Sequence, residues 1–304
     1  MYKIFGFYKF MQINKLKLLK KNLEYLIKKE AIRGTIIISI EGVNGTISFI
    51  PTKLKKVRNK ILKLLSITKF DNENISSYKY QAFNKGKIKI KKEVVPIGMK
   101  LNKKIVKNKI EPGDWNKFIL KKETVIIDTR KSFEFKVGTF KGSINPKLNN
   151  FREFPEFFKT LKKNQNIGMF CTGGIRCEKA SAYLRKKGFK NVYQLKGGII
   201  NYLDNVSKKD SLWRGDCFVF DNRVSIKHGL KSGNLKICAG CREPIKLLEI
   251  KSSYYEEGVS CSNCYDKLTN LQKQRFRMRQ KQTLTAKKNG KKYFFQKEAW
   301  NEFT

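Results

Sequence analysis

A strand-to-helix turn over residues 169–177, with the sequence MFCTGGIRC, constrains the fold of this chain more than any other segment. The apolar residues 167–170 predict a short buried strand, and residues 177–187 have the spacing of an amphipathic helix. Two adjacent glycines let the backbone curl tightly between them. The sequence therefore places Cys171 at the end of a strand and just before a helix.

Cys171 has the surroundings of a reactive thiol. The curled backbone at Gly173 and Gly174 directs successive N–H groups at one point, and the following helix adds partial positive charge there. Together with Arg176, these groups favour charged sulfur and lower the pKa of a thiol. A thiolate, a persulfide or an oxyanion would be stabilised. The alternative is that Cys171 is a small core residue, as many free cysteines are.

A short loop joins the two main residues of the predicted site. We expect Cys171 and Arg176 to be catalytic. The active-site loop between them is Thr172, Gly173, Gly174 and Ile175. Cysteine phosphatases related to this fold have a longer loop, which makes a ring wide enough for phosphate, so the shorter loop suits sulfur chemistry better. Cys177 is either a thiol that resolves an oxidised Cys171 or a small buried residue.

Strands and helices alternate from residue 113 to residue 210. This order predicts a parallel sheet covered by helices, with the site at the carboxyl end of the strand before Cys171. Asp128 and Arg130 end a neighbouring strand, where they either orient the loop or form a structural ion pair. The expected elements are 125–128, 153–161, 167–171, 177–187, 192–195 and a helix after Gly197 and Gly198.

Residues 1–98 follow the order β-α-β-β-α-β, which predicts a ferredoxin-like α+β domain. The open face of such a sheet often binds RNA, and four aromatic residues are candidates for it or, alternatively, core residues. They are Phe5, Phe7, Tyr78 and Tyr80. The basic segment 85–92 is either a linking strand with one solvated face or an RNA contact. The expected elements are strand 2–9, helix 16–27, strand 35–40, turn 42–45, strand 46–50, helix 54–65 with Thr52 near its N-cap, and strand 77–83.

Two CxxC pairs lie in the C-terminal part, residues 211–304. They are Cys238 with Cys241 and Cys261 with Cys264, and 19 residues separate them. Each pair can hold two thiolates on a tight knuckle, so that both pairs together form a tetrahedral site of four thiolates. We expect a small zinc-ribbon-like module with structural zinc, and a redox dithiol is the alternative. A site closed by four thiolates leaves no open position for catalysis.

The chain carries 67 Lys and Arg against 25 Asp and Glu, a formal charge of +42. This excess favours a polyanionic partner, although biased genome composition is another source of it. RNA fits better than a membrane, because no run of about 18 apolar residues is present. The basic tail, residues 265–292, holds ten Lys or Arg and one acid. We expect RNA contact there through Arg275, Arg277 and Arg279, with a solvated tail as the alternative.

The N-terminus lacks the order of a signal peptide, since charges interrupt its apolar runs. We therefore expect a cytoplasmic protein, whose seven cysteines are better explained as metal ligands or catalytic thiols than as disulfides. The single histidine, His228, is expected to be structural. No flavin, haem or non-haem iron motif is apparent, and the sequence identifies no protein partner.

The central part of the chain resembles a rhodanese domain, which would span residues 113–210. Cys171 matches the cysteine that carries sulfur as a persulfide in that family. The resemblance rests on CTGGIRCEKA at 171–180, VIIDTR at 125–130, Glu134, Gly138 and FKGS at 140–143. With EGVNGT at 41–46 and the segments around 212–230, nearly the whole chain resembles the rhodanese-related bacterial tRNA uridine hydroxylases.

The resemblance implies an oxidoreductase of the monooxygenase type. It would make 5-hydroxyuridine at the wobble position of tRNA, U34, with molecular oxygen as co-substrate. Cys171 would either add to uridine C6, which makes C5 electron-rich, or carry a reactive persulfide, while Arg176 and the loop amides stabilise negative charge. The alternatives are a sulfurtransferase that carries a persulfide on Cys171, and a non-catalytic tRNA-binding protein.

Overall fold

The computed structural model describes residues 1–99 and 108–290. The chain divides into two compact units, and each is described by itself. The first unit comprises Met1–Cys217 and Lys227–Lys231, and the second comprises Phe218–Ile226 and Ser232–Thr304.

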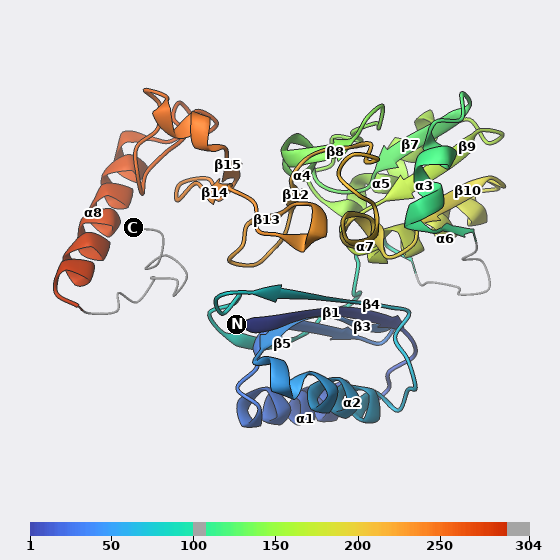
Figure 1. The fold of residues 1–304 in the computed structure, drawn as a ribbon, viewed down its shortest axis with the longest axis horizontal. Helices are drawn as coiled ribbons and strands as arrows, with labels where there is room; N and C mark the ends of the chain where they lie inside the picture. The colour runs from blue at the N-terminus through green and yellow to red at the C-terminus, as the bar shows by residue number, and fades with distance from the viewer. Residues whose placement is uncertain (100–107, 291–304) are drawn as a thin grey trace. The chain divides into compact units, whose positions relative to one another are not determined.

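The first unit begins with a β-α-β-β-α-β arrangement, as the sequence predicts (Figure 1). Its elements are β1 (Tyr2–Phe10), α1 (Leu16–Lys29), β2 (Arg33–Ser39), β3 (Gly42–Phe49), α2 (Leu54–Leu65), β4 (Asn72–Tyr78) and β5 (Gly86–Ile90). The sheet order is β4-β1-β3-β2-β5, and its neighbours are antiparallel except β2 and β5. The first four strands have the ferredoxin-like order, and β5 extends this sheet within the predicted basic linking segment.

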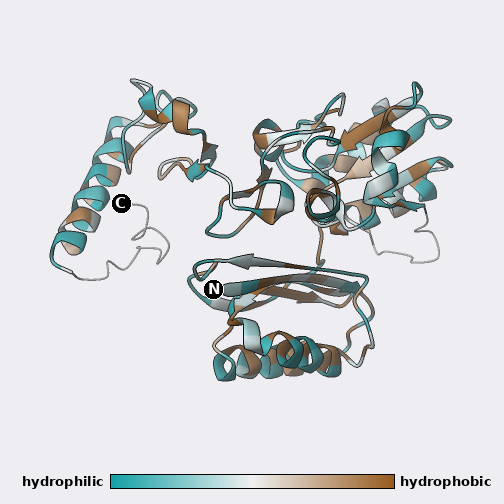
Figure 2. Ribbon diagram, in the orientation of Figure 1, coloured by the Kyte–Doolittle hydropathy of each residue, from teal (hydrophilic) through white to brown (hydrophobic). Residues whose placement is uncertain are grey.

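Helices α1 and α2 bury their apolar stripes against this sheet. In α1 the buried residues are Leu19, Leu23 and Leu26, three or four positions apart. Figure 2 shows that both helices carry hydrophilic as well as hydrophobic residues, as expected of helices with one solvated side. Thr52 lies next to the N-cap of α2, as predicted, but it is part of a short 3₁₀ turn, and the N-cap residue itself, Lys53, makes no side-chain cap.

The aromatic residues proposed for RNA binding are largely interior. Phe5 and Phe7 lie in the hydrophobic core, where both rings contact Phe70. Tyr78 is buried in a smaller apolar cluster, against which the half-buried Tyr80 packs. The core interpretation, which the sequence left open, therefore holds for Phe5, Phe7 and Tyr78.

Two strand boundaries of this sheet differ from the prediction. The turn lies at residues 40–41 rather than 42–45, because Gly42 already pairs with Phe10. The last strand of the motif, β4, begins at Asn72 and not at residue 77. This strand lies at the edge of the sheet and carries polar residues on both faces. It therefore lacks the run of apolar residues that marks a central strand.

A second, parallel sheet follows in the same unit, as predicted. Its strand order is β6-β10-β9-β7, which puts the strand before Cys171 between two neighbours. The elements are β6 (Lys109–Ile110), α3 (Pro112–Ile119), β7 (Thr124–Asp128), α4 (Ser132–Val137), α5 (Phe154–Phe157), β9 (Asn166–Phe170), α6 (Ile175–Lys186), β10 (Val192–Leu195) and α7 (Gly198–Asn205).

Two helices of this region differ from the prediction. The helix expected over residues 153–161 is reduced to α5, with a 3₁₀ turn on each side. The phenylalanines of this segment pack against one another, and the ring centres of Phe154 and Phe158 are 4.1 Å apart. Aromatic packing rather than a long helix therefore holds the segment in place. The helix after the active-site loop, α6, begins at Ile175, two residues before its expected start.

A two-stranded pairing ties the segment beyond residue 210 to the first unit. The strands are β8 (Gly138–Phe140) and β11 (Trp213–Gly215), and they run antiparallel. The ring of Trp213 packs edge-on against Phe140, with 5.1 Å between ring centres. Residues up to Cys217 therefore belong to the first unit.

The second unit contains a small hairpin and a long helix. They are β14 (Lys236–Ile237), β15 (Pro244–Ile245) and α8 (Asn270–Lys288). Thr269 caps α8, because its side chain accepts a hydrogen bond from the N–H of Gln272. Residues 291–304 of the expected module, including the last two residues of the basic tail, lie outside the described residues. No helix in the described part of the chain is long and apolar enough to cross a bilayer.

Candidate active site and metal centre

Cys171 lies directly after β9, at the carboxyl end of the parallel sheet. The residue is 1% exposed, and its Sγ accepts a hydrogen bond of 3.1 Å from the N–H of Gly174. Gly174 has a left-handed backbone, with φ of 91°, which favours glycine. The loop therefore curls around the sulfur in the way that the paired glycines predict.

The first turn of α7 holds the other side of the loop. The N–H of Ile199 donates to the carbonyl of Cys171, and the N–H of Ile200 donates to that of Thr172, both at 3.0 Å. Gly198 permits this approach, because a Cβ there would lie 2.4 Å from the Cys171 carbonyl oxygen. The free N–H groups of a helix start thus bind the loop carbonyls and leave the loop amides directed at the sulfur.

Arg176 forms a two-pronged ion pair with Glu134 of α4. Its Nη1 and Nη2 lie 3.0 Å and 3.1 Å from the two carboxylate oxygens, and Nη2 lies 3.5 Å from Oγ1 of Thr172. Burial raises the pKa of Glu134, but the charge and hydrogen bonds of Arg176, the charge of Arg130 and the N–H of Lys131 together lower the pKa below its usual value. Glu134 therefore stays ionised and fixes the guanidinium beside the loop.

The surroundings of Cys171 favour its thiolate. Burial raises the pKa of this thiol, but the hydrogen bond with the Cys177 thiol, the charge of Arg176 and nearby backbone N–H groups lower it to about 6. Cys177 shows the opposite shift, because burial and its contact with Cys171 raise its pKa well above the usual value. At neutral pH the site holds an ionised Cys171 and a protonated Cys177, which suits nucleophilic attack by Cys171.

Asp128 and Arg130 form a fully buried ion pair, which is one of the two roles that the sequence left open. The guanidinium lies 2.9 Å and 2.6 Å from the two carboxylate oxygens, and it also donates to the carbonyl of Gly138. Between them, Thr129 donates to the carbonyl of Phe170 at 3.0 Å. This strand end therefore braces the strand that carries Cys171.

Residues of the N-terminal sheet also reach the active-site loop, which the sequence did not predict. The hydroxyl of Tyr8 donates to Glu178 on α6 at 2.9 Å. The side-chain amide of Asn72 donates to the carbonyl of Gly173 at 3.3 Å. Tyr8 and Asn72 face each other on the paired strands β1 and β4. Two neighbouring positions of one sheet thus contact the loop and the helix that follows it.

A buried lysine makes a second connection to the N-terminal sheet. The Nζ of Lys179 is 3.0 Å from both carboxylate oxygens of Glu41, and it also pairs with Glu93. Glu41 opens the EGVNGT segment, in which the sequence predicts a turn. A signal was present, because Lys179 lies four residues before the apolar Tyr183 in the predicted helix 177–187, and a buried lysine needs carboxylate partners.

His228 lies outside the active-site loop. It begins the 3₁₀ turn His228–Leu230, which packs against α7. Burial and the charge of Lys208 lower its pKa. Within the described residues, no hydrogen bond joins His228 to Cys171, and its structural role stays a prediction.

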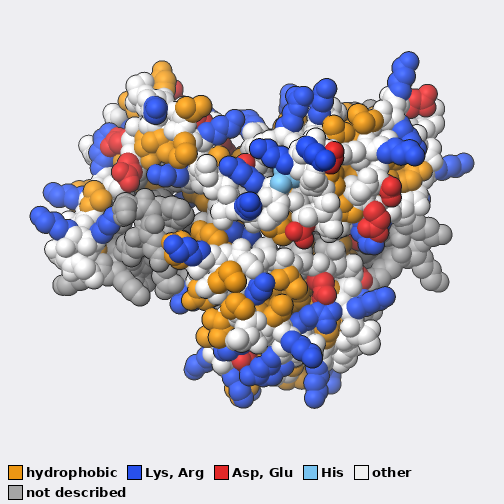
Figure 3. All heavy atoms as spheres, viewed as in Figure 1, with side chains coloured by type: hydrophobic (Ala, Val, Ile, Leu, Met, Phe, Trp, Pro, Cys, Tyr) orange, Lys and Arg blue, Asp and Glu red, His pale blue; other side chains and the backbone are white. Residues whose placement is uncertain are grey.

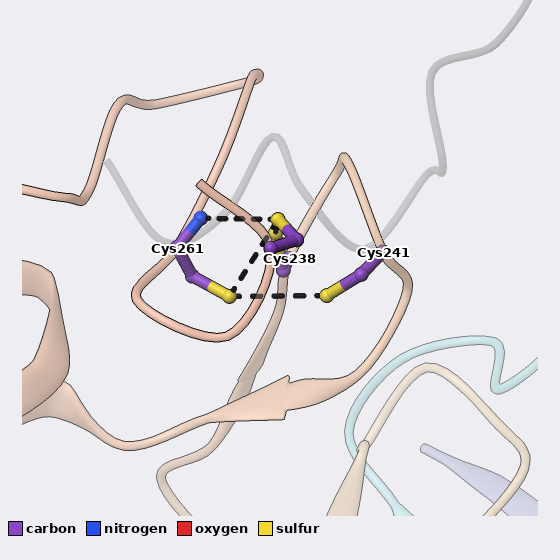
Figure 4. A group of neighbouring side chains, drawn as sticks. Cys238, Cys241 and Cys261 are labelled. Carbon is purple, nitrogen blue, oxygen red and sulfur yellow. Dashed lines mark hydrogen bonds between the residues drawn. The ribbon is translucent and has the colours of Figure 1, made fainter. Parts of the chain in front are cut away.

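The second unit brings together the four cysteines of the CxxC pairs, of which Figure 4 labels Cys238, Cys241 and Cys261. All four sulfur atoms lie within 4.8 Å of one another. Cys238 is 3.8 Å from Cys264, Cys241 is 3.8 Å from Cys261, and Cys261 is 3.9 Å from Cys264. Zn–S bonds of about 2.3 Å in a tetrahedron place sulfur atoms about 3.8 Å apart. The four ligand atoms therefore have the spacing of a structural zinc site.

The three arginines proposed for RNA contact lie on α8 with different surroundings. Arg277 pairs with Glu256 at 2.6 Å and 2.7 Å. Arg279 donates to the carbonyl of Ala239, between the first two cysteines, at 3.1 Å. Both therefore help to hold α8 against the cysteine module, whereas Arg275 is exposed. Figure 3 shows Lys and Arg side chains spread widely over the visible face.

Comparison with known proteins covers nearly the whole chain. Residues 2–94 match the UPF0176 acylphosphatase-like domain, and residues 111–205 match the rhodanese-like domain. A tRNA uridine(34) hydroxylase of Pelagibacter ubique is 60% identical over 300 residues, 98% of this chain and 99% of that protein. Proteins with the same name from Rhizobium leguminosarum and Bartonella quintana are each 40% identical, over 94% of this chain and 94% and 96% of theirs.

Proposed function

This chain belongs to the tRNA uridine(34) hydroxylase family, and we propose that Cys171 is the residue through which it hydroxylates C5 of the wobble uridine in tRNA. The observation that carries the proposal is the state of that thiol. Its pKa of about 6, the N–H of Gly174 and the fixed charge of Arg176 make Cys171 a thiolate at neutral pH. A thiolate can attack C6 of uridine, the electron-poor end of the C5–C6 double bond.

The chemistry follows from that attack. As Sγ bonds to C6, the electron pair of the double bond moves to C5 and the uracil O4, where Arg176 and the loop amides offset the negative charge. The electron-rich C5 takes one atom of molecular oxygen. The other atom leaves as water with two protons and two electrons from an external reductant. Loss of the C5 proton and of the sulfur then restores the ring and the thiolate.

The C-terminal module supports this activity by binding the substrate. We propose that Cys238, Cys241, Cys261 and Cys264 hold structural zinc, whose role is to fix the module, since a site closed by four thiolates has no open position. Exposed Arg275 and the other cations of α8 would then contact the tRNA backbone. Because its substrate is a bacterial tRNA, the protein would act in the cytoplasm.

The test is the nucleoside content of tRNA from cells that lack the gene. Complementation with the wild-type gene should restore 5-hydroxyuridine derivatives at the wobble position, and Cys171→Ser should not. Cys217→Ser is the matched control, because Cys217 is a buried cysteine of the same unit that lies outside the active-site loop.

Mass spectrometry separates the competing functions. Hydroxylation adds one oxygen atom to uridine, whereas a sulfurtransferase would exchange oxygen for sulfur. Loss of a thiolated uridine in the deletion strain would therefore replace the hydroxylase with a sulfurtransferase. Full restoration of 5-hydroxyuridine by Cys171→Ser would exclude the proposed role of this thiol.

A further inference from the structure

The catalytic loop is not supported by the rhodanese region alone. Tyr8 lies on β1 and is 5% exposed, and its side chain points toward α6 rather than toward the core that α1 and α2 cover. Its hydroxyl is 2.9 Å from Glu178, three residues after Ile175, where α6 begins. A tyrosine of the N-terminal domain therefore reaches the first turn of the helix that follows the loop.

The same hydroxyl lies against the glycine that binds the sulfur. A Cβ built on Gly174 would be 3.3 Å from the Tyr8 oxygen, and the N–H of Gly174 is the group that donates to Cys171. The contact thus fills the space over a backbone position that has an unusual conformation. Only one peptide unit separates the Tyr8 hydroxyl from the thiolate.

Asn72 holds the preceding residue of the loop. Its side-chain amide donates to the carbonyl of Gly173 at 3.3 Å. Because Asn72 is the cross-strand partner of Tyr8, the two side chains contact consecutive glycines from one place on the sheet. A carbonyl held from one side turns the following N–H to the other side, which is where the sulfur lies.

The hydroxyl of Tyr8 donates its hydrogen bond in one direction, toward Glu178. Burial, followed by the charge of Glu178, raises the pKa of Tyr8, and the charge of Cys171 acts in the same sense. The phenol therefore remains protonated and donates to Glu178. That carboxylate also accepts from Lys109 at 2.5 Å, so it is held on two sides.

We propose that Tyr8 and Asn72 are positioning residues for the reaction at Cys171, which makes the N-terminal domain a structural part of the active site. They act through Gly173, Gly174 and Glu178, and they hold the loop in the conformation in which its amides meet the sulfur. This inference deepens the proposed function and rests on it for the link to hydroxylation. The effect on the thiol itself can be measured without tRNA.

The first measurement is the pH dependence of alkylation of Cys171 by iodoacetamide in the full-length protein, read by mass spectrometry of its peptide. Tyr8→Phe should move the midpoint of this curve upward by about half a unit, which is about a threefold loss of rate below the midpoint. Asn72→Ala should move it in the same direction. Tyr2→Phe makes the same change on the same strand away from the loop and should leave the midpoint unchanged.

The second measurement is hydroxylation of tRNA at varied tRNA concentration. Tyr8→Phe should lower kcat by about tenfold and leave the tRNA concentration at half-maximal rate unchanged, because the residue positions the nucleophile and does not bind RNA. A raised half-saturating concentration with a normal alkylation midpoint would overturn the proposal in favour of RNA contact.

The two measurements test the hydroxylase function and the positioning role of Tyr8 separately. If wild-type protein hydroxylates no uridine, the proposed function fails, while the alkylation midpoints still decide whether Tyr8 positions the loop. A folded Tyr8→Phe protein with the wild-type midpoint overturns the positioning role. If circular dichroism shows that Tyr8→Phe is unfolded, the test passes to Asn72→Ala, because Asn72 is only half-buried. A wild-type alkylation midpoint in that variant would overturn the positioning role.

Discussion

The guanidinium of Arg176 forms a bidentate ion pair with the carboxylate of Glu134, with nitrogen–oxygen distances of 3.0 Å and 3.1 Å. Because Glu134 is fully buried and ionised, it fixes the orientation of the arginine as well as balancing its charge. The cation that stabilises the Cys171 thiolate is therefore a fixed group, ready before substrate binds. Such preorganised charge costs no rearrangement when negative charge develops.

This pairing predicts that Arg176 cannot be replaced by lysine. Arg176→Lys retains a positive charge but loses the planar fork that matches Glu134. We expect a fall in kcat for hydroxylation of about 100-fold, of the order seen when one donor to a developing anion is removed. Arg152→Lys, at an exposed position of the same unit, is the control. An Arg176→Lys enzyme with normal kcat would show that charge alone suffices.

The shifted pKa of Cys171 predicts an unusual pH profile for its alkylation. The rate should rise as pH increases through about 6, because the thiolate is the reacting form, whereas an ordinary cysteine reacts only as pH approaches about 8.5. Cys177, whose pKa is raised, should stay unmodified throughout this range. Peptide mass spectrometry after brief treatment with iodoacetamide measures both residues together. A midpoint above about pH 8 for Cys171 would contradict the activated thiolate.

The cysteine cluster predicts bound zinc and a local effect of its loss. Purified protein should contain one zinc ion per chain by elemental analysis, and Cys261→Ser should lower this content, while the adjacent Ser262→Ala should not. Zinc removal should weaken tRNA binding, because α8 is anchored on the module through Arg279 and Arg277. The alkylation midpoint of Cys171, in the other unit, should not change. Zinc-free protein with full tRNA affinity would argue against this role.

The buried Lys179 predicts a large stability effect. Lys179→Met removes a fully buried charge and leaves Glu41 and Glu93 without their shared partner. Breaking one side of a buried ion pair typically costs about 3 kcal/mol in the free energy of unfolding. Urea denaturation would measure this loss. Lys186→Met, at an exposed position of the same helix, should change it by less than about 0.5 kcal/mol. Equal stability of the two variants would refute the buried-charge interpretation.

Glu30 predicts acid sensitivity of the N-terminal sheet. This carboxylate ends α1 and contacts three lysines, and hydrogen bonds from Lys60 and Lys56 lower its pKa from 4.5 to about 2. A carboxylate with a lowered pKa in the folded state contributes stability above about pH 4.5, and that contribution fades as pH falls toward 2. Glu30→Gln should therefore destabilise at about pH 7 more than at about pH 3. Glu24→Gln, an exposed change on the same helix, should show little such difference.

The sequence predicted the parts of this protein that depend on local patterns. The strand-to-helix turn at Cys171, the succession of elements in the ferredoxin-like and rhodanese regions and the clustering of the CxxC pairs all follow from residue spacing. The start of the edge strand β4 was misplaced, because most of its residues are polar and form no pattern of alternating apolar residues. The sequence did not identify which distant segments contact one another. Nothing near Tyr8 or Glu41 in the sequence shows that their partners lie more than 130 residues away.

The ion cluster of Lys179 with Glu41 and Glu93 also bears on how such a chain can evolve. A lysine whose counter-charges come from another domain cannot be transferred without them. Recombination that exchanged only the rhodanese region between distant lineages would leave either the buried ammonium or its two carboxylates without the opposite charge. The ion cluster therefore makes the choice of residue 179 in the rhodanese region depend on residues 41 and 93 of the N-terminal region.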